Sequence, residues 1–266
     1  MFGLSALLFV LTAAFSVFTG YYFLIGLPFA LLFFYAGWKW SGSLFYLLLF
    51  SLPFSFEYRF TSGFGTDFPD ELMMVFISFI FLARWLYSPD LIAAKTMQHP
   101  LLLLLMASLA WMTVTVCFST DSFISLKYLL AKSWYSGAFV IAPLIILKNK
   151  QTIAKTARIL AGAMLLVTTI VLFRHYQTGF SFAGINDAVA PFFRNHVNYS
   201  AMLVCMVPVL VAFFSGTKNR DTRWLIAVLI GIALTALFFS YARGAWLALL
   251  TGAAAGWLIK RKWLIA

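Results

Sequence analysis

The sequence predicts an all-α integral membrane protein, a bundle of transmembrane helices that occupies residues 1–266 as one domain. The first reason is composition: 63% of the 266 residues are hydrophobic and 10% are charged, against roughly 45–50% and about 25% in a soluble domain. The second reason is that the apolar residues come in runs of about 20, the length that crosses a bilayer. A soluble enzyme, a nucleic-acid binder, a disordered segment and a disulfide-rich secreted protein are all disfavoured.

About ten apolar runs have the length of a membrane span, and the last four residues have the composition of the start of another. No polar stretch between the runs exceeds about 25 residues, which leaves no room for a separate soluble domain. Cys117 and Cys205 lie inside such runs and are expected to be packing residues rather than metal ligands. The predicted spans are 2–19, 21–37, 41–56, 72–88, 100–118, 128–147, 157–173, 197–215, 224–240 and 244–259.

The distribution of charge predicts how these spans are oriented. Cytoplasmic loops carry an excess of Lys and Arg, and alternating the spans places thirteen basic and two acidic residues on one side. Six basic and six acidic residues fall on the other side, so the whole formal charge of +11 belongs to the first. The first side is therefore predicted to be cytoplasmic, together with the N-terminus. Its basic residues are Lys39, Arg84, Lys95, Lys148, Lys150, Lys155, Arg158, Lys218, Arg220, Arg223, Lys260, Arg261 and Lys262.

Three outer arginines have few acidic neighbours in the sequence. Arg174 ends one predicted span, Arg194 begins the next, and Arg243 lies at the tip of the following hairpin of spans. The planar guanidinium group suits phosphate oxygens, which it binds through two parallel hydrogen bonds. We therefore expect the three arginines to hold a diphosphate whose lipid tail stays in the bilayer. The alternative is that each pairs locally with an acid or a lipid headgroup.

Two further polar residues are expected near this diphosphate site. His196 follows Arg194 closely, and a histidine acts as a base or a hydrogen-bond donor near neutral pH. An ordinary interfacial histidine is the alternative for this residue. Lys132 lies about one turn inside the outer end of its predicted span and is expected to contact the same substrate.

No nucleotide, redox or metal cofactor is expected. The sequence contains none of the common motifs for phosphate loops, zinc hydrolases, dinucleotide binding or serine nucleophiles. Asp70 and Glu71 begin a predicted span, where acids complement the helix N-terminus. A metal site that combines these two residues with Asp67 is the less favoured alternative. An enzyme of this kind would act on lipid-borne substrates without a bound nucleotide.

Two segments resemble a known family. Ser240-Tyr241-Ala242-Arg243-Gly244-Ala245-Trp246-Leu247 resembles the S-x-x-R-G-x-W-L signature of the O-antigen ligase and polysaccharide polymerase superfamily. The stretch Phe193-Arg194-Asn195-His196-Val197-Asn198-Tyr199-Ser200 is similar to the asparagine-containing motif that opens a span just upstream in those proteins. The run from His99 to Lys127 is similar to a third, weaker region. Together the resemblance covers roughly residues 70–260.

The resemblance implies a multi-pass glycosyltransferase of the bacterial inner membrane, with its site facing the periplasm. Such proteins take a glycan from undecaprenyl diphosphate and join it to lipid A–core, a growing glycan or a protein, in the assembly of cell-surface polysaccharides such as lipopolysaccharide. They need neither metal nor nucleotide. Carried over by position, Arg243 binds the diphosphate and Arg194 assists, with His196 as the third catalytic candidate. The expected substrate-binding residues are Arg174, Lys132, Asn198 and Tyr241.

The sequence departs from the superfamily in one respect. Members continue into a large outer loop with a histidine motif, which this sequence does not include, so the chain is expected to lack the family's C-terminal part. It is then a fragment, a chain that works with a partner, or an inactive member. Two other functions remain open: a transporter or flippase of lipid-linked glycans, and a non-catalytic membrane subunit whose arginines contact lipid headgroups.

Overall fold

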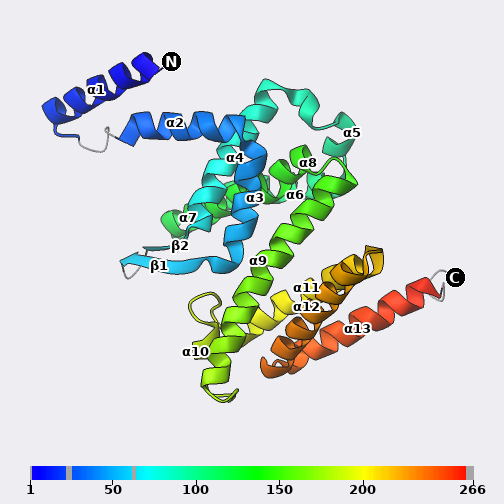
Figure 1. Ribbon diagram of the computed structural model, residues 1–266. Helices are drawn as coiled ribbons and strands as arrows, with labels where there is room; N and C mark the ends of the chain where they lie inside the picture. The colour runs from blue at the N-terminus through cyan, green and yellow to red at the C-terminus, as the bar shows by residue number, and fades with distance from the viewer. Residues whose placement is uncertain (1, 22–25, 62–63, 262–266) are drawn as a thin grey trace. The chain divides into compact units, whose positions relative to one another are not determined.

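The computed structural model describes residues 2–21, 26–61 and 64–261, and the chain folds as two compact units. The first unit comprises residues 1–48 and 71–152, and the second comprises residues 49–70 and 153–266. Both consist chiefly of helices (Figure 1). The prediction that residues 1–266 form a single membrane domain stays a prediction.

The first unit is built on helices joined by short turns. Two of its helices are capped by the side chain of the preceding residue: His99 accepts a hydrogen bond from the amide of Leu101, and Asp121 accepts one from the amide of Ile124 at 3.0 Å. These caps satisfy amides that have no partner inside the helix. The elements are α1 (Phe2–Thr19), α2 (Gly26–Lys39), α3 (Ser41–Ser51), α4 (Asp70–Tyr87), a short turn (Pro89–Leu91), α5 (Ala94–Met97), α6 (Pro100–Cys117), α7 (Ser122–Ser136), a π-helical segment (Gly137–Ile141) and α8 (Ala142–Ile146).

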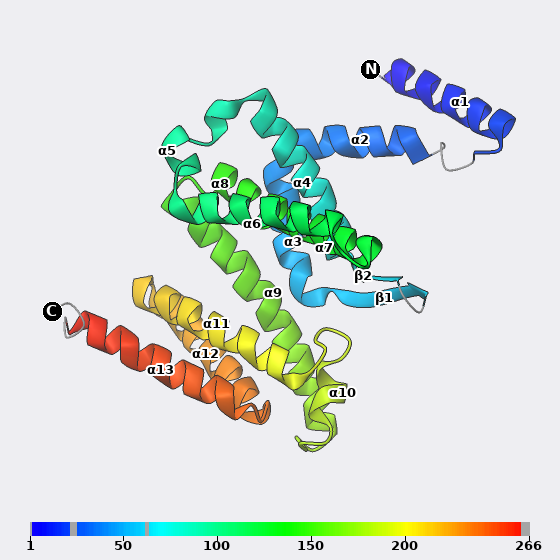
Figure 2. The same cartoon turned by 180° about the vertical axis from the view of Figure 1, so that it is seen from behind.

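The second unit contains an antiparallel set of long helices, of which α11, α12 and α13 lie side by side (Figures 1 and 2). Asn195 caps α11 by accepting from the amide of Asn198 at 2.9 Å, and Asn219 caps α12 in the same way. The buried alanines Ala233 and Ala236 of α12 leave room for the larger side chains of α11 in one continuous core. The elements are a short turn (Leu52–Phe54), β1 (Phe56–Thr61), β2 (Phe64–Phe68), α9 (Lys150–Gln177), α10 (Ile185–Val189), α11 (His196–Gly216), α12 (Arg220–Phe239) and α13 (Arg243–Lys260).

Each of the ten predicted spans overlaps a helix, but fewer of these helices have the properties of a membrane span. Among the described residues, five are long and apolar enough: Pro100–Cys117, Ser122–Ile146, Lys150–Gln177, His196–Gly216 and Arg220–Phe239. The expected number of about ten is therefore not reached. The start of another span at 263–266 lies outside the described residues.

The helices that fall short do so for physical reasons. The apolar part of α3 ends at Ser51, about 16 Å from its start, which is half the thickness of a hydrocarbon core. Helix α4 carries Asp70, Glu71 and Arg84, and placing a charged side chain in the hydrocarbon core is unfavourable in free energy. Helix α13 begins with Arg243 and is rich in Gly and Ala, which lowers its mean hydropathy.

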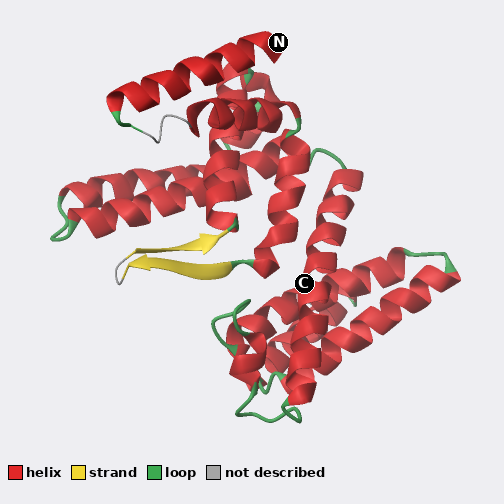
Figure 3. Ribbon diagram, turned by 60° about the vertical axis from the view of Figure 1, so that its left-hand side comes forward, coloured by secondary structure: helices red, strands yellow, loops and turns green. Residues whose placement is uncertain are grey.

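A β-hairpin interrupts the otherwise helical chain, and the all-α prediction missed it. Strands β1 and β2 pair antiparallel, with Phe56 opposite Phe68 and Glu57 opposite Asp67 (Figure 3). The sequence from Phe56 to Thr61 alternates aromatic and polar residues, which is the period of a strand. The sequence prediction instead assigned Phe56 to the span 41–56 and the residues that follow it to a loop.

Charge separates the two ends of the second unit. Helix α9 begins, α11 ends, α12 begins and α13 ends at one end, which we call the basic end. The opposite end carries β1–β2 and the loop from Thr178 to Asn195, and we call it the hairpin end. The described Lys and Arg residues near the basic end are Lys155, Arg158, Lys218, Arg220, Arg223, Lys260 and Arg261.

Candidate functional site

A cavity of about 740 Å³ with a mixed polar and apolar lining lies at the hairpin end of the second unit. Its walls come from the turn before β1, the two strands, the loop before α11 and the first turns of α11. We call it the hairpin cavity. A volume between roughly 300 and 1,000 Å³ is typical of pockets that bind small molecules. The polar residues that line it are Ser55, Glu57, Asp67, Asp70, Arg194 and Asn198.

Arg194 and Glu57 form an ion pair in this cavity. The Nη2 atom of Arg194 lies 3.8 Å from Oε2 of Glu57, and the two side chains are 71% and 36% exposed. Glu57 faces Asp67 across the hairpin, and like charges in that register repel. The guanidinium of Arg194 offsets this repulsion, while its exposure leaves further N–H donors for a ligand.

Asp70 forms a fixed part of the cavity wall. It is 8% exposed, and its Oδ1 accepts a hydrogen bond of 2.5 Å from the Ser55 hydroxyl. The carboxylate also begins α4, where the helix dipole favours negative charge. The described residues contain no group of three or more His, Cys, Asp or Glu placed to hold a metal ion.

Arg174 uses its guanidinium to fasten the loop that follows α9. Its Nη2 donates to the backbone oxygen of Asp187 at 2.9 Å, and its Nη1 donates to that of Ala190. Both sides of the fork thus bind carbonyl groups of the protein, and the expected role of Arg174 in substrate binding stays a prediction. It anchors the segment that leads into the hairpin cavity.

An aromatic cluster holds the same loop against the turn between α12 and α13. The buried His175 places Nε2 2.9 Å from the backbone oxygen of Ser181, and its ring contacts Phe180 and Tyr241. The Tyr241 hydroxyl donates to the backbone oxygen of Phe180 at 2.6 Å, and the Phe180 ring stacks on Phe239. Tyr241, which was expected to bind substrate, therefore has a structural contact in this loop.

His196 contacts Asn186 through both its backbone amide and its ring. Its backbone amide donates to Oδ1 of Asn186 at 3.1 Å, which shows that the amide oxygen faces the histidine. The ring Nδ1 lies 3.0 Å from the same oxygen, so Nδ1 carries a hydrogen. In the neutral ring, Nε2 is then unprotonated and is able to accept a proton. Phe182 contacts the rings of both His196 and Tyr241.

Arg243 begins α13 at the hairpin end and is exposed. Within the described part of the chain it forms no hydrogen bond or ion pair. It follows Tyr241 by two residues and Arg194 precedes His196 by two, so the Phe182 contacts bring the two arginine-bearing segments to the same end. The residues that line the hairpin cavity nevertheless include Arg194 and Asn198 but neither Arg243 nor Arg174.

Lys132 belongs to the first unit and lies deeper along its helix than the sequence suggested. Helix α7 begins at Ser122, six residues before the predicted start of that span, so Lys132 lies about 15 Å along the helix rather than one turn inside it. The sequence predicted Asp67 and Asp70 only as part of a less favoured metal site, and it did not single out Glu57, Phe182 or Asn186. The strand alternation from Phe56 was the available signal for Glu57.

No protein-family model, no curated protein and no solved structure matches the chain. The resemblance to the O-antigen ligase superfamily stays a prediction that rests on the motifs around Arg194 and Arg243.

Proposed function

We propose that the chain is a membrane glycosyltransferase of the O-antigen ligase type. It transfers a glycan from undecaprenyl diphosphate to a hydroxyl group of an acceptor sugar, on lipid A–core, a glycan or a protein. The hairpin cavity carries this proposal, because it joins an exposed arginine to several hydrogen-bonding groups at the end of apolar helices. A lipid-linked glycan presents its diphosphate and its sugars at that depth of a membrane.

The lining of the cavity suits sugars better than it suits a buried anion. Glu57, Asp67 and Asp70 outnumber Arg194, so a diphosphate deep in the cavity would meet more negative than positive charge. Carboxylates and the Asn198 amide instead bind sugar hydroxyls. We place the glycan in the cavity and the diphosphate at its rim, beside the exposed guanidinium of Arg194.

The reaction needs two contributions from the protein. The acceptor oxygen bonds to the anomeric carbon while the bond between that carbon and the diphosphate oxygen breaks. Arg194 and the exposed Arg243 stabilise the negative charge that develops on the departing diphosphate. The proton of the acceptor hydroxyl passes to Nε2 of His196, which the Asn186 contact leaves free to accept it.

The charge pattern supports a bacterial inner-membrane location with the hairpin end in the periplasm. Basic residues gather at the opposite end of the second unit, as expected for a cytoplasmic face. The same rule places the N-terminus in the cytoplasm. Membrane lipids then surround the five apolar helices.

Reconstitution tests this function. The protein is placed in vesicles with oligosaccharide-bearing undecaprenyl diphosphate and a core-sugar acceptor, and transferred glycan is measured. We expect Arg194→Ala and Arg243→Ala each to reduce transfer by about 100-fold or more. Arg158→Ala, at the basic end, is the matched control and retains transfer. Absence of transfer by the wild-type protein with every acceptor class contradicts the proposal.

A further inference from the structure

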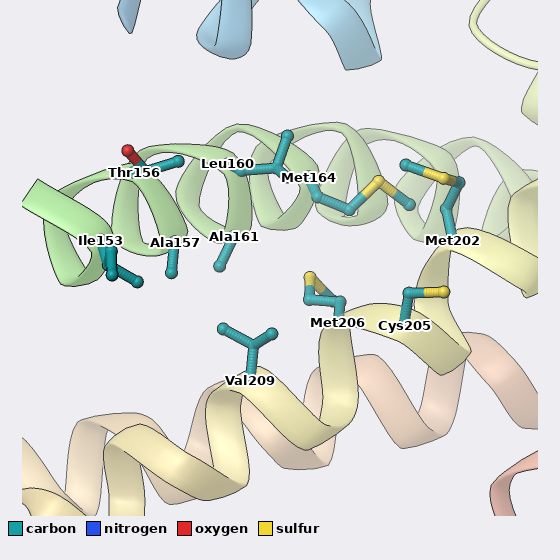
Figure 4. Close-up of a pocket in the computed structure, with 10 residues that line it drawn as sticks. All are labelled: Ile153, Thr156, Ala157, Leu160, Ala161, Met164, Met202, Cys205, Met206 and Val209. Atoms are coloured by element: carbon teal, nitrogen blue, oxygen red, sulfur yellow. The ribbon is translucent and has the colours of Figure 1, made fainter. Parts of the chain in front are cut away.

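An apolar groove of about 280 Å³ lies between α9 and α11 in the second unit (Figure 4). Ala157 and Ala161, one turn apart on α9, provide its shallow wall. Met202, Met206 and Val209 face them from α11, spaced three or four residues apart on one side of that helix. Small residues on one helix and long flexible ones on the other leave a trough that a chain-like ligand fills.

The groove and the hairpin cavity share one lining residue on α11. Met202 lines both of them, and its side chain is 40% exposed. The lining of the hairpin cavity combines charged residues such as Glu57 and Arg194 with apolar ones, whereas that of the groove is almost wholly apolar. This change in polarity matches the junction between the headgroup and the hydrocarbon chain of a lipid.

We propose that the groove holds the polyprenyl chain of the lipid-linked donor whose headgroup occupies the hairpin cavity. This inference rests on the proposed function for the identity of the headgroup. The groove has room for one narrow chain, and a polyprenyl diphosphate has one, whereas a phospholipid would leave its second chain outside. Methionine thioethers adapt to the irregular outline of a methyl-branched, unsaturated chain.

The dimensions fit part of such a chain. From Ile153 to Met164 the groove follows eleven residues of α9, or about 16 Å, which is roughly half of the hydrocarbon core. The remainder of the chain lies in the bilayer. Because lipid tails are as apolar as the groove, transfer into it gains little hydrophobic free energy. Its effect is to orient the diphosphate against Arg194, and correct orientation lowers the barrier of the reaction.

Photo-crosslinking tests the occupancy of the groove directly. The wild-type protein in nanodiscs is irradiated with a polyprenyl diphosphate that carries a diazirine within its first isoprene units, and adducts are mapped by mass spectrometry. We expect adducts at Met164, Met202 and Met206, suppressed by excess unlabelled polyprenyl diphosphate but not by the same excess of phosphatidylglycerol. Labelling spread evenly over lipid-facing positions such as Leu166 overturns the proposal. Suppression by phosphatidylglycerol also overturns it, because the groove is then a general lipid site.

A pair of variants on α9 tests the consequence for transfer. Ala157→Trp fills the groove, and Leu166→Trp adds the same side chain at a position that is 52% exposed and outside the groove. We expect Ala157→Trp to lower transfer from a long-chain donor by about tenfold and to leave transfer from a two-isoprene donor at the wild-type rate. Leu166→Trp retains both activities. Equal loss with the two donors overturns the proposal, since the substitution then acts through folding.

The two proposals fail separately. Labelling of the groove without any glycan transfer supports the lipid site and removes the glycosyltransferase function. Glycan transfer with labelling that avoids the groove keeps the function and overturns the lipid site.

Discussion

Arg194 and Glu57 lie 3.8 Å apart although they are 137 positions apart in the sequence, one before α11 and the other in β1. The contact links the β-hairpin to the helical part of the second unit. It also explains how two carboxylates, Glu57 and Asp67, face each other in register on neighbouring strands. Arg194 places a positive charge beside them, which reduces their repulsion.

Removal of the Glu57 carboxylate is expected to affect transfer more than folding. Because the pair is largely exposed, Glu57→Gln should change the free energy of unfolding by less than about 1 kcal/mol. Arg194 then loses the partner that aims it at the cavity, and transfer should fall by about threefold to tenfold. Unfolding in detergent and transfer in vesicles measure the two effects. A loss of stability without a change in transfer would make the pair purely structural.

Arg174→Ala is expected to loosen the loop from Thr178 to Asn195. The substitution removes the charged donor of the Asp187 and Ala190 backbone oxygens, and because both hydrogen bonds are exposed the loss should cost about 0.5–1.5 kcal/mol. Limited proteolysis should therefore cut this loop faster in Arg174→Ala than in the wild-type protein. Arg174→Lys keeps the charge but not the fork, and should be intermediate. If proteolysis is unchanged while transfer is lost, Arg174 is a ligand of the diphosphate after all.

Arg174 and Arg194 show that the sequence predicts where a residue lies along a helix but not which residues it contacts. Both were identified from their place at the ends of apolar runs, and both do lie at the hairpin end. The runs themselves located the helices, because apolar length alone marks them. The partners of the arginines come from segments distant in sequence, the strand at Glu57 and the loop at Ala190. Periodicity carries no information about such contacts.

The same limit applies to the number of spans. A run such as 41–56 contains enough apolar residues to count as a span, yet its last part turns at Pro53 and enters a strand. Aromatic residues occur in both apolar helices and strands. Only the alternation of aromatic and polar residues that begins at Phe56 distinguishes a strand from a helix here. The hairpin in turn supplies most of the carboxylates of the cavity, and these residues could not be grouped with Arg194 before the hairpin was known.

Asn186 is expected to control His196 without touching the substrate. Asn186→Leu removes the acceptor that holds the hydrogen on Nδ1, so the ring samples the other tautomer and other rotations. We expect transfer to fall by about tenfold in Asn186→Leu and further in His196→Ala. The two single variants and the double variant give the test: the double variant should be no slower than His196→Ala alone. Full activity of His196→Gln would remove this histidine as the base.

Gly137 of the π-helical segment is expected to tolerate no side chain. A Cβ atom built on it overlaps the Cβ and Oγ atoms of Ser78, whose hydroxyl donates to the backbone oxygen of Trp134 at 2.7 Å. Gly137→Ala should therefore lower the free energy of unfolding by about 1–3 kcal/mol, and adding Ser78→Gly should recover part of it. Gly162→Ala is the matched control. No atom lies within 4 Å of its added Cβ, and alanine is favoured in a helix by about 1 kcal/mol. In detergent, the unfolding temperature of Gly162→Ala should lie above that of the wild-type protein, and that of Gly137→Ala should lie below it. The reverse order would show that the close contact between α4 and the π-helical segment is not maintained in the folded protein.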